Sequence, residues 1–171
     1  MNAAAIADAL TSGRRPSLLL ILVSAASLAG ALTAQFGFGM QPCHLCLLQR
    51  IPYGCAIVLA AIAAADGGDL RLRALLLGVC AAVFATNAGI AFYHVGVEQH
   101  WWESSCAGGA ARLATDAGGL LAKLKQGPAA PACDMIPFSI FGLSFAGMNL
   151  IASLVLACFA AWSARRALRA A

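Results

Sequence analysis

Charged residues are scarce in this chain. Only 11% of its 171 residues are charged and just seven side chains are acidic, whereas 61% of the residues are hydrophobic. The mean hydropathy is +0.83. A soluble domain carries about 25% charged residues, and one of this size has no core that could bury so much apolar surface. The scarcity of charge excludes an ordinary soluble globular protein and indicates a membrane protein.

The few charges divide the sequence into apolar segments. Residues 16–38, 74–97 and 142–164 contain no Asp, Glu, Lys or Arg, and each is long enough to cross about 30 Å of hydrocarbon at roughly 1.5 Å per helical residue. A further segment lies at 44–65. Together they predict an all-α membrane protein, a four-transmembrane-helix bundle in which residues 1–171 form one integral domain in the lipid bilayer.

The segment at 44–65 is the shortest. Only 15 residues separate Arg50 from Asp66, and as a helix they reach roughly 22 Å, which falls short of the bilayer. The helix must therefore take in residues before Arg50, beginning near Pro42 or Cys46, and proline is favourable at a first helical position. This start brings Cys46 and Arg50 to the membrane surface, where the arginine can extend towards water.

Basic residues are concentrated on one side of these segments. The positive-inside rule assigns seven of them to the cytoplasm: Arg14, Arg15, Arg71, Arg73, Arg165, Arg166 and Arg169. Both termini are therefore expected to be cytoplasmic, and the loops at about 39–45 and 98–141 lie on the opposite side. The net charge of +4 follows from this bias and does not indicate nucleic-acid binding.

The first segment has another interpretation. Arg14 and Arg15 before an apolar run are also typical of a cleaved signal peptide, including the twin-arginine type. The run is longer than the usual apolar region of about 7–15 residues, and its removal would leave three segments with mismatched orientation. We therefore interpret it as a true span.

The long outer loop carries a weaker pattern. Apolar residues within 109–126 fall at helical spacing, which predicts a short amphipathic helix lying on the membrane surface. Gly118 and Gly119 weaken this pattern, and a loosely ordered loop is the alternative. Trp101 and Trp102, at the start of the loop, are typical of the aromatic belt at a membrane interface.

Four of the seven cysteines lie at or beyond the ends of the apolar segments, all on the outer side: Cys43, Cys46, Cys106 and Cys133. Thiols grouped on the oxidising face of a bilayer suggest electron transfer rather than packing. The other three, Cys55, Cys80 and Cys158, fall inside apolar runs and are expected to be small buried hydrophobic residues.

Cys43 and Cys46 form a C-x-x-C sequence in or beside the first turn of the second helix. A thiol reacts as the thiolate, which is favoured at a helix N-terminus and near a cation. Arg50 lies four residues after Cys46, so the two side chains share a face of a helix that runs through both. The same guanidinium can bond a quinone carbonyl and stabilise the charge that develops on reduction. An interface anchor is the alternative role for Arg50.

A C-x-x-C sequence is not by itself specific to redox chemistry. It is also typical of an inert structural bridge or of a zinc or copper site, here with His44, His94 or His100. Cys106 and Cys133 are separated single cysteines rather than the second close doublet of a structural zinc site. The second pair on the same face favours redox chemistry, and we expect no metal, haem or nucleotide site.

The stretch Pro42-Cys43-His44-Leu45-Cys46-Leu47-Leu48-Gln49-Arg50, the four segments and the later cysteine pair closely resemble the DsbB family. The resemblance covers nearly the whole chain. It implies a multi-pass protein of the bacterial inner (plasma) membrane, with its redox cysteines in the periplasm. It further implies a protein-disulfide:quinone oxidoreductase that reoxidises a periplasmic DsbA-like dithiol oxidase of the thioredoxin fold and reduces the membrane quinone pool, the system that keeps the periplasm oxidising.

The resemblance also implies a role for each cysteine. Cys106 and Cys133 would form the disulfide that the partner attacks, with Cys106 in the mixed disulfide. Cys133 would pass the reducing equivalents to Cys43, while Cys46 would meet the quinone as a thiolate and Arg50 would help to hold that quinone. Small residues around Cys106 permit the close approach that thiol–disulfide exchange requires.

Other features of the site remain open at this point. The resemblance places His94, at the outer end of the third segment, near the quinone, and an amphipathic interfacial histidine is the alternative. The quinone can be ubiquinone or menaquinone, because generic apolar helix surface does not distinguish them. Two rival functions are a vitamin K epoxide reductase-like enzyme, whose C-x-x-C we expect near its final span, and a non-enzymatic metal-binding or transport protein.

Overall fold

The computed structural model describes residues 13–104, 106 and 131–171. Four helical segments are long and apolar enough to cross a membrane: Arg15–Gly37, His44–Ala65, Leu70–Glu98 and Phe145–Arg169. They comprise α2 (Arg15–Leu32) with the π-helical turn η1 (Thr33–Gly37), α3 (His44–Leu48) with α4 (Arg50–Ala65), α5 (Leu70–Glu98) and α7 (Phe145–Arg169). The predicted all-α, four-helix membrane architecture is confirmed. The amphipathic helix predicted within 109–126 lies outside the described residues.

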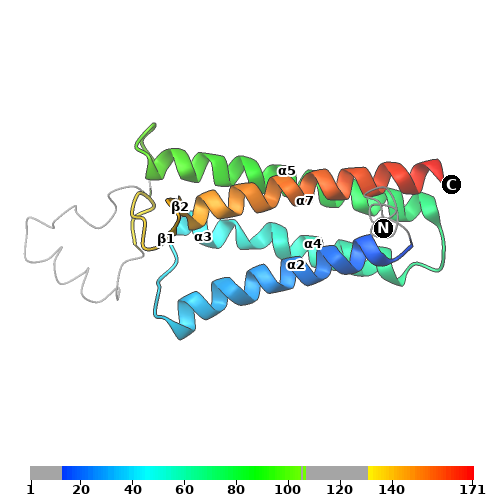
Figure 1. Cartoon of the computed structure of the whole chain (residues 1–171), viewed down its shortest axis with the longest axis horizontal. Coiled ribbons are helices and arrows are strands. Elements are labelled where there is room, and N and C mark those ends of the chain that lie inside the picture. The colour runs from blue at the N-terminus through cyan, green and yellow to red at the C-terminus, as the bar shows by residue number, and fades with distance from the viewer. Residues whose placement is uncertain (1–12, 105, 107–130) are drawn as a thin grey trace, which may run out of the picture.

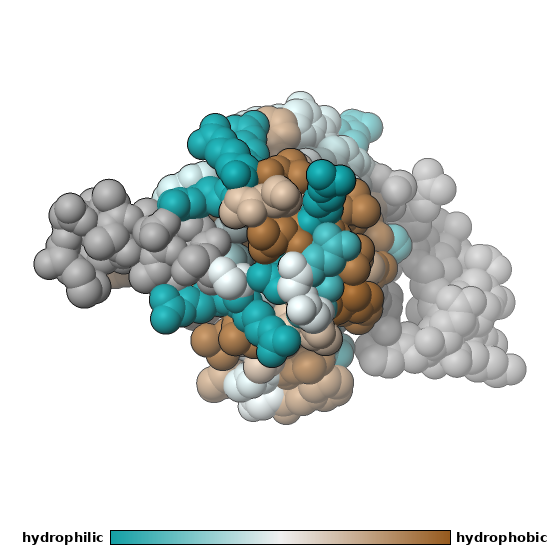
Figure 2. All heavy atoms as spheres, turned by 90° about the vertical axis from the view of Figure 1, so that its right-hand side faces the viewer, coloured by the Kyte–Doolittle hydropathy of each residue, from teal (hydrophilic) through white to brown (hydrophobic). Residues whose placement is uncertain are grey.

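The helices run side by side along the long axis of the molecule (Figure 1). The start of α2, the connection from α4 to α5 and the end of α7 lie at one end of the bundle, and α3 lies at the other. Figure 2 looks onto the first end, where hydrophilic side chains gather and hydrophobic residues flank them. An ion pair between Arg73 and Asp66, with 3.6 Å between nitrogen and oxygen, joins α5 to the end of α4 there.

Half of the buried residues in the core between the helices are small, either alanine or cysteine. In lipid, helices associate through close packing, which small side chains permit. Its largest side chains include Tyr53 and Phe84, whose rings meet edge to face at 5.7 Å. The buried residues of this cluster are Leu20, Tyr53, Ala56, Ala60, Leu77, Cys80, Phe84, Leu156, Ala160 and Ala164.

The three cysteines inside the helices do not share one environment. Cys80 is buried in the core, as predicted, but Cys55 and Cys158 are exposed on the outer surface of the bundle. The prediction of burial was therefore wrong for these two. Their positions on α4 and α7 turn them away from the other helices, towards the surroundings that lipid occupies, where an apolar thiol is tolerated.

The second span is interrupted at Gln49, between α3 and α4. Pro52 has no N–H with which to bond the carbonyl of Leu48, four residues earlier, so the first helix ends and the second begins. Gln49 is buried, with its side chain among the helices. Cys43 stands at the N-cap of α3, with extended backbone, so the helix starts at His44.

A small hairpin precedes the last helix. β1 (Ser139–Ile140) pairs antiparallel with β2 (Leu143–Ser144). The two residues between them, Phe141 and Gly142, both have positive φ, as a type I′ turn requires. Ser144 then caps α7, since its side-chain oxygen accepts the N–H of Gly147 at 3.1 Å.

Trp102 folds back against the end of α5. Its indole N–H donates to the carbonyl of Tyr93 at 3.0 Å, and its ring stacks on the Tyr93 ring at 5.8 Å. A Cβ at Gly96 would overlap the Trp102 ring, so this packing requires glycine there. Trp101, in contrast, is exposed, as expected of a belt residue.

Candidate redox site

The C-x-x-C pair sits where α3 begins. Cys43 and Cys46 form a disulfide with their Cα atoms 5.1 Å apart. The backbone N–H of Cys46 donates to the Cys43 sulfur at 3.1 Å, so the sulfur occupies the place of a side-chain cap. A helix N-terminus stabilises negative charge, and the first turn of α3 therefore favours a thiolate when the pair is reduced.

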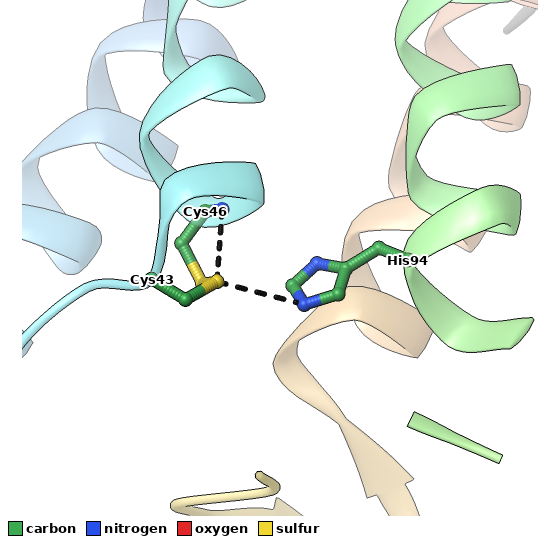
Figure 3. Close-up of side chains that lie close together, drawn as sticks. All are labelled: Cys43, Cys46 and His94. Carbon is green, nitrogen blue, oxygen red and sulfur yellow. Dashed lines mark hydrogen bonds between the residues drawn. A yellow bond between two sulfur atoms is a disulfide. The ribbon is translucent and has the colours of Figure 1, made fainter. Parts of the chain in front are cut away.

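His94 reaches this pair from α5 (Figure 3). Its Nε2 lies 3.6 Å from the Cys43 sulfur, and its Nδ1 lies 3.2 Å from the side-chain nitrogen of Gln49. The ring is 3% exposed, and the backbone of Cys133 also interacts with it. His94 thus lies next to the first cysteine pair and close to the second.

A chain of amide side chains continues from His94 into the bundle. The side-chain N–H of Asn149 donates to Gln49 Oε1 at 2.9 Å, and Asn149 Oδ1 accepts from the Tyr53 hydroxyl at 2.6 Å. Asn87 completes the chain with a bond to the Ser153 hydroxyl at 2.9 Å. Buried polar groups need such partners in lipid, and this network fixes the orientation of the Gln49 amide.

A cavity opens beside Cys46. Its volume is about 160 Å³, and its polar lining comes from Ser27, Gln41, Gln49, Arg50, Tyr53 and Asn149. A dry apolar cavity of about 150 Å³ is large enough to hold a benzene ring. Most of the remaining lining is apolar and comes from α2, η1, the segment before α3, the segment before β1 and the start of α7: Leu28, Ala31, Ala34, Met40, Pro42, Pro137 and Phe145. The cavity therefore suits a six-membered ring with polar substituents, beside a cysteine sulfur.

Arg50 is held at one side of this cavity. One guanidinium nitrogen donates to Gln35 Oε1 at 2.7 Å, and the other donates to the carbonyl of Ala31 at 3.5 Å. Both partners belong to the first helical segment, so Arg50 joins two helices as well as lining the cavity. A guanidinium has five N–H donors, which leaves donors for a ligand.

The second pair, Cys106 and Cys133, also forms a disulfide, with Cα atoms 5.4 Å apart. The N–H of Cys133 donates to the carbonyl of Cys106 at 2.8 Å. Cys133 is fully buried and Cys106 is partly exposed. The two pairs meet in one hydrophobic cluster that consists of Cys43, Cys46, Leu45, Val97, Trp102, Cys106 and Cys133.

Glu98 completes the surroundings of His94. It lies one turn further along α5, with Oε1 3.9 Å from His94 Nε2. Its other oxygen accepts a short hydrogen bond from the Ser144 hydroxyl, the residue that caps α7. The carboxylate is 6% exposed.

Sulfur and nitrogen donors for a metal are present in the same place. The Cys43 and Cys46 sulfurs and a His94 ring nitrogen all lie within 4.8 Å of one another. Two thiolates and an imidazole would suit zinc or copper. The two sulfurs are bonded to each other here, so only the reduced pair could offer both of them to an ion.

The structure thus brings together the six residues named from the sequence. The four cysteines share one cluster, His94 contacts Cys43, and Arg50 lines the cavity with Cys46. Among the described residues, His94 is not one of those that line the cavity. Instead, the His94 ring contacts the sulfur of Cys43. The other two histidines, His44 and His100, are exposed.

Sequence reasoning missed Gln49, Tyr53 and Glu98. The proximity of Glu98 to His94 could have been predicted, because an acidic residue four positions after a histidine shares its helix face. The contact of Gln49 with Asn149 joins residues 100 positions apart, and nothing local in the sequence predicts it.

Comparison with known families agrees with this geometry. The family model described as "Disulfide bond formation protein DsbB" matches residues 13–163. The chain belongs to the DsbB family. The family match supports this assignment over a vitamin K epoxide reductase-like protein.

Individual relatives carry the same name. A "Disulfide bond formation protein B" of Neisseria meningitidis is 34% identical over 91 residues, which cover 53% of this chain and 54% of the relative. One of Methylococcus capsulatus is 43% identical over 88 residues, with 50% and 52% covered. "Disulfide bond formation protein B 1" of Pseudomonas fluorescens is 36% identical over 88 residues, with 48% of each chain covered. The chain thus spans about half the length of these relatives, and no solved structure matches it.

Family and fold together define the protein in general terms. It is a multi-pass membrane protein of the DsbB family, and the described residues include four candidate membrane-spanning helices. The DsbB family implies oxidoreductase activity in that process, and quinones are the oxidants with which the family works.

Proposed function

We propose that this protein oxidises a periplasmic dithiol protein of the thioredoxin fold, DsbA-like, and reduces a membrane quinone. The observation that carries the proposal is the single cluster in which both cysteine pairs meet, with one member, Cys46, lining a ring-sized cavity. A protein with only structural disulfides has no need of such a cavity beside a sulfur.

The first half of the reaction is a transfer of disulfides. A partner thiolate attacks Cys106, which forms the mixed disulfide and releases Cys133 as a thiolate. Cys133 attacks Cys43, so a Cys43–Cys133 bond forms and Cys46 leaves as a thiolate. The second thiol of the partner then displaces Cys106, and Cys106 displaces Cys43 from Cys133. The partner leaves oxidised, and both electrons reside on the reduced Cys43 and Cys46. Contact of all four cysteines in one cluster supports this order.

The second half is reduction of the quinone, either ubiquinone or menaquinone. The reduced pair loses two electrons and two protons as its disulfide forms again, and the quinone takes up both to become the hydroquinone. The cavity admits the ring beside Cys46, and the Arg50 guanidinium can bond a quinone oxygen as negative charge develops there. The position of His94 beside Cys43 supports a role in handling the thiol proton rather than in contacting the ring.

The proposed orientation follows from the basic end of the bundle. Positive residues mark the cytoplasmic side, and the arginines at the starts of α2 and α5 and at the end of α7 lie at the end opposite α3 (Figure 1). This arrangement supports an orientation with both termini in the cytoplasm and the four cysteines in the periplasm, and the DsbB family supports a bacterial inner-membrane location.

The decisive experiment is an oxidation assay with the full-length protein in detergent. A reduced thioredoxin-fold dithiol protein is mixed with a short-chain ubiquinone or menaquinone, and quinone absorbance and partner thiols are followed together. We expect one quinone reduced for each partner disulfide formed. Partner oxidation that proceeds equally well without quinone, or no oxidation with either quinone, would contradict the proposal.

A metal-binding protein is the second candidate, favoured by the Cys43, Cys46 and His94 donors. Mass spectrometry of protein purified without reductant separates the two functions. Redox function predicts Cys43–Cys46 and Cys106–Cys133 linkages with no stoichiometric metal. Free thiols with one bound ion per chain would instead establish the metal site and overturn the redox proposal.

A further inference from the structure

Glu98 is a buried carboxylate that the electron relay does not use. It stands at the end of a membrane-spanning helix and is 6% exposed. Ionisable groups are costly to bury in such a place, and those that persist usually serve a function. The contacts of Glu98 are specific, since one oxygen faces His94 and the other accepts from Ser144.

The hydrogen bonds around His94 determine which ring nitrogen carries the proton. Gln49 Oε1 is occupied by the N–H of Asn149, so the amide turns its own N–H groups towards His94 Nδ1. A nitrogen that accepts a hydrogen bond is unprotonated, and in a neutral imidazole the proton is then on the other nitrogen. That nitrogen, Nε2, faces both the Cys43 sulfur and Glu98.

We propose that Glu98 is a positioning residue that, together with Gln49, holds a proton on His94 Nε2 and aims it at the Cys43 sulfur. The inference rests on the proposed function for the step that it assists. When the Cys106 thiolate attacks Cys133, the Cys106–Cys133 bond forms and the Cys43–Cys133 bond breaks. The electron pair of that bond stays on Cys43, which leaves as a thiolate. The Nε2–H then donates a hydrogen bond to this thiolate and stabilises its charge while the proton stays on the ring, and no additional oxidant or reductant is needed.

In the part of the chain that the structure describes, few other charged groups lie near this pair. His94 is on the same helix as Glu98, Cys43 comes from the start of α3, and β2 and the start of α7 contribute the uncharged Ser144. Asp134 follows Cys133 on the segment packed over His94 and is partly exposed. The Cys46 thiol of the reduced pair and His44 also lie beside Cys43, but they are the same in every variant tested. A difference between variants in the pH profile of the Cys43 sulfur therefore reports on His94 and Glu98.

The test measures the reactivity of Cys43 directly. Full-length protein is reduced, freed of reductant and treated with iodoacetamide at a series of pH values, and alkylation of each cysteine is quantified by mass spectrometry. Glu98→Gln keeps the volume and an acceptor for Ser144 but removes the charge. We expect Cys43 to be alkylated roughly tenfold more slowly at pH 7 and its pH–rate midpoint to move upwards, because a charge-assisted interaction is lost. An unchanged profile would overturn the proposal.

Glu103→Gln provides a matched control, because Glu103 is an exposed carboxylate five residues further on. We expect this variant to leave the pH profile of Cys43 alkylation unchanged. If both variants slow alkylation of Cys43 equally, the effect comes from the loss of any nearby negative charge, and the inference is refuted. His94→Asn should slow alkylation even where Glu98→Gln fails to fold, and normal Cys43 reactivity in His94→Asn would likewise refute it.

The double variant tests whether Glu98 acts through His94. Interacting residues show non-additive effects, so Glu98→Gln should produce no further slowing when His94 is Asn. The same tenfold slowing in that background would contradict a role through His94. Because alkylation requires neither quinone nor partner, failure of this inference is distinguishable from failure of the proposed function.

Discussion

The two disulfides are held by different kinds of structure. Cys43 and Cys46 are three residues apart at the first turn of a helix, and their positions are set by a cap and by side chains of other helices. Cys106 and Cys133 are 27 residues apart in the sequence, lie outside the described helices and pack against the first pair. A preorganised pair suits repeated chemistry at one ligand cavity, whereas a pair outside the helices suits attack by a protein.

The largest effect is expected at the cavity side of the first pair. Cys46→Ser removes the sulfur that lines the cavity, and quinone reduction should fall by more than roughly 1,000-fold because no other group can take its place. Cys106 should still form a covalent adduct with the partner, as seen on a non-reducing gel. Cys55→Ser, on the exposed face of the same span, is the control and should retain full turnover. Unchanged turnover in Cys46→Ser would show that the two pairs are not divided in this way.

Arg50 should have the next largest effect, confined to the first pair. We expect Arg50→Leu to raise the apparent KM for quinone by roughly 10- to 100-fold, which corresponds to a charge-assisted hydrogen bond of about 1.5–3 kcal/mol. Both disulfides should still form. Arg71→Leu, the same change at the opposite end of the bundle, should leave the KM unaltered.

A second control addresses the protein partners of Arg50. Gln35→Leu removes the side chain that accepts from the guanidinium and leaves its charge in place. It should change the quinone KM less than Arg50→Leu does. If Gln35→Leu and Arg50→Leu raise the KM equally, Arg50 serves to anchor the first helix rather than to hold the quinone.

Gly96→Ala should disturb the second pair more than the first. A Cβ at Gly96 would overlap the Trp102 ring, and Trp102 packs in the cluster that joins Cys106 and Cys133 to the helices. Forced overpacking costs about 1–3 kcal/mol. Oxidation of the protein partner should therefore slow by roughly five- to tenfold. A small dithiol such as dithiothreitol, which needs only the partly exposed Cys46, should support quinone reduction nearly as before.

The control for this variant is Gly89→Ala on the same helix. An added Cβ there meets nothing within 4 Å, and both rates should be unchanged. If Gly96→Ala slows oxidation of the protein partner and of dithiothreitol equally, the two cysteine pairs respond as one unit. That result would contradict the view that they are held by different kinds of structure.

The two pairs also differ in how far the sequence predicts them. Apolar length, arginine placement and the C-x-x-C spacing are local signals, and they predict four helices and a reactive pair at the start of the second. Burial of Cys80 but not of Cys55 depends on how each helix is rotated in the bundle. That rotation follows from packing over the whole helix surface, which no single segment encodes.

The contacts around His94 show the same limit more clearly. Glu98 shares its helix face and could be inferred from spacing alone. Gln49 contacts His94 because the break at Gln49 turns its side chain inwards. Asn149 in turn bonds Gln49 because α7 packs along α5. The hairpin at 139–144 likewise depends on the paired positive φ values of Phe141 and Gly142, and phenylalanine is an unusual residue for that conformation.

The smallest effect is expected at Tyr53, which bonds to the amide network through Asn149. Tyr53→Phe removes the hydroxyl that donates to Asn149 Oδ1, while Asn87 and the Ser153 hydroxyl remain as donors to the same oxygen. Loss of one hydrogen bond of several should cost about 0.5–1.5 kcal/mol. We expect the quinone KM to rise roughly two- to fivefold and the covalent adduct between Cys106 and the partner to form as before. Tyr93→Phe, at the only other tyrosine of the chain, is the control in the same assay. A loss of adduct formation in Tyr53→Phe would show that the amide network supports both cysteine pairs. The two pairs would then differ only in whether the quinone or the protein partner can contact them, and not in the structure that positions them.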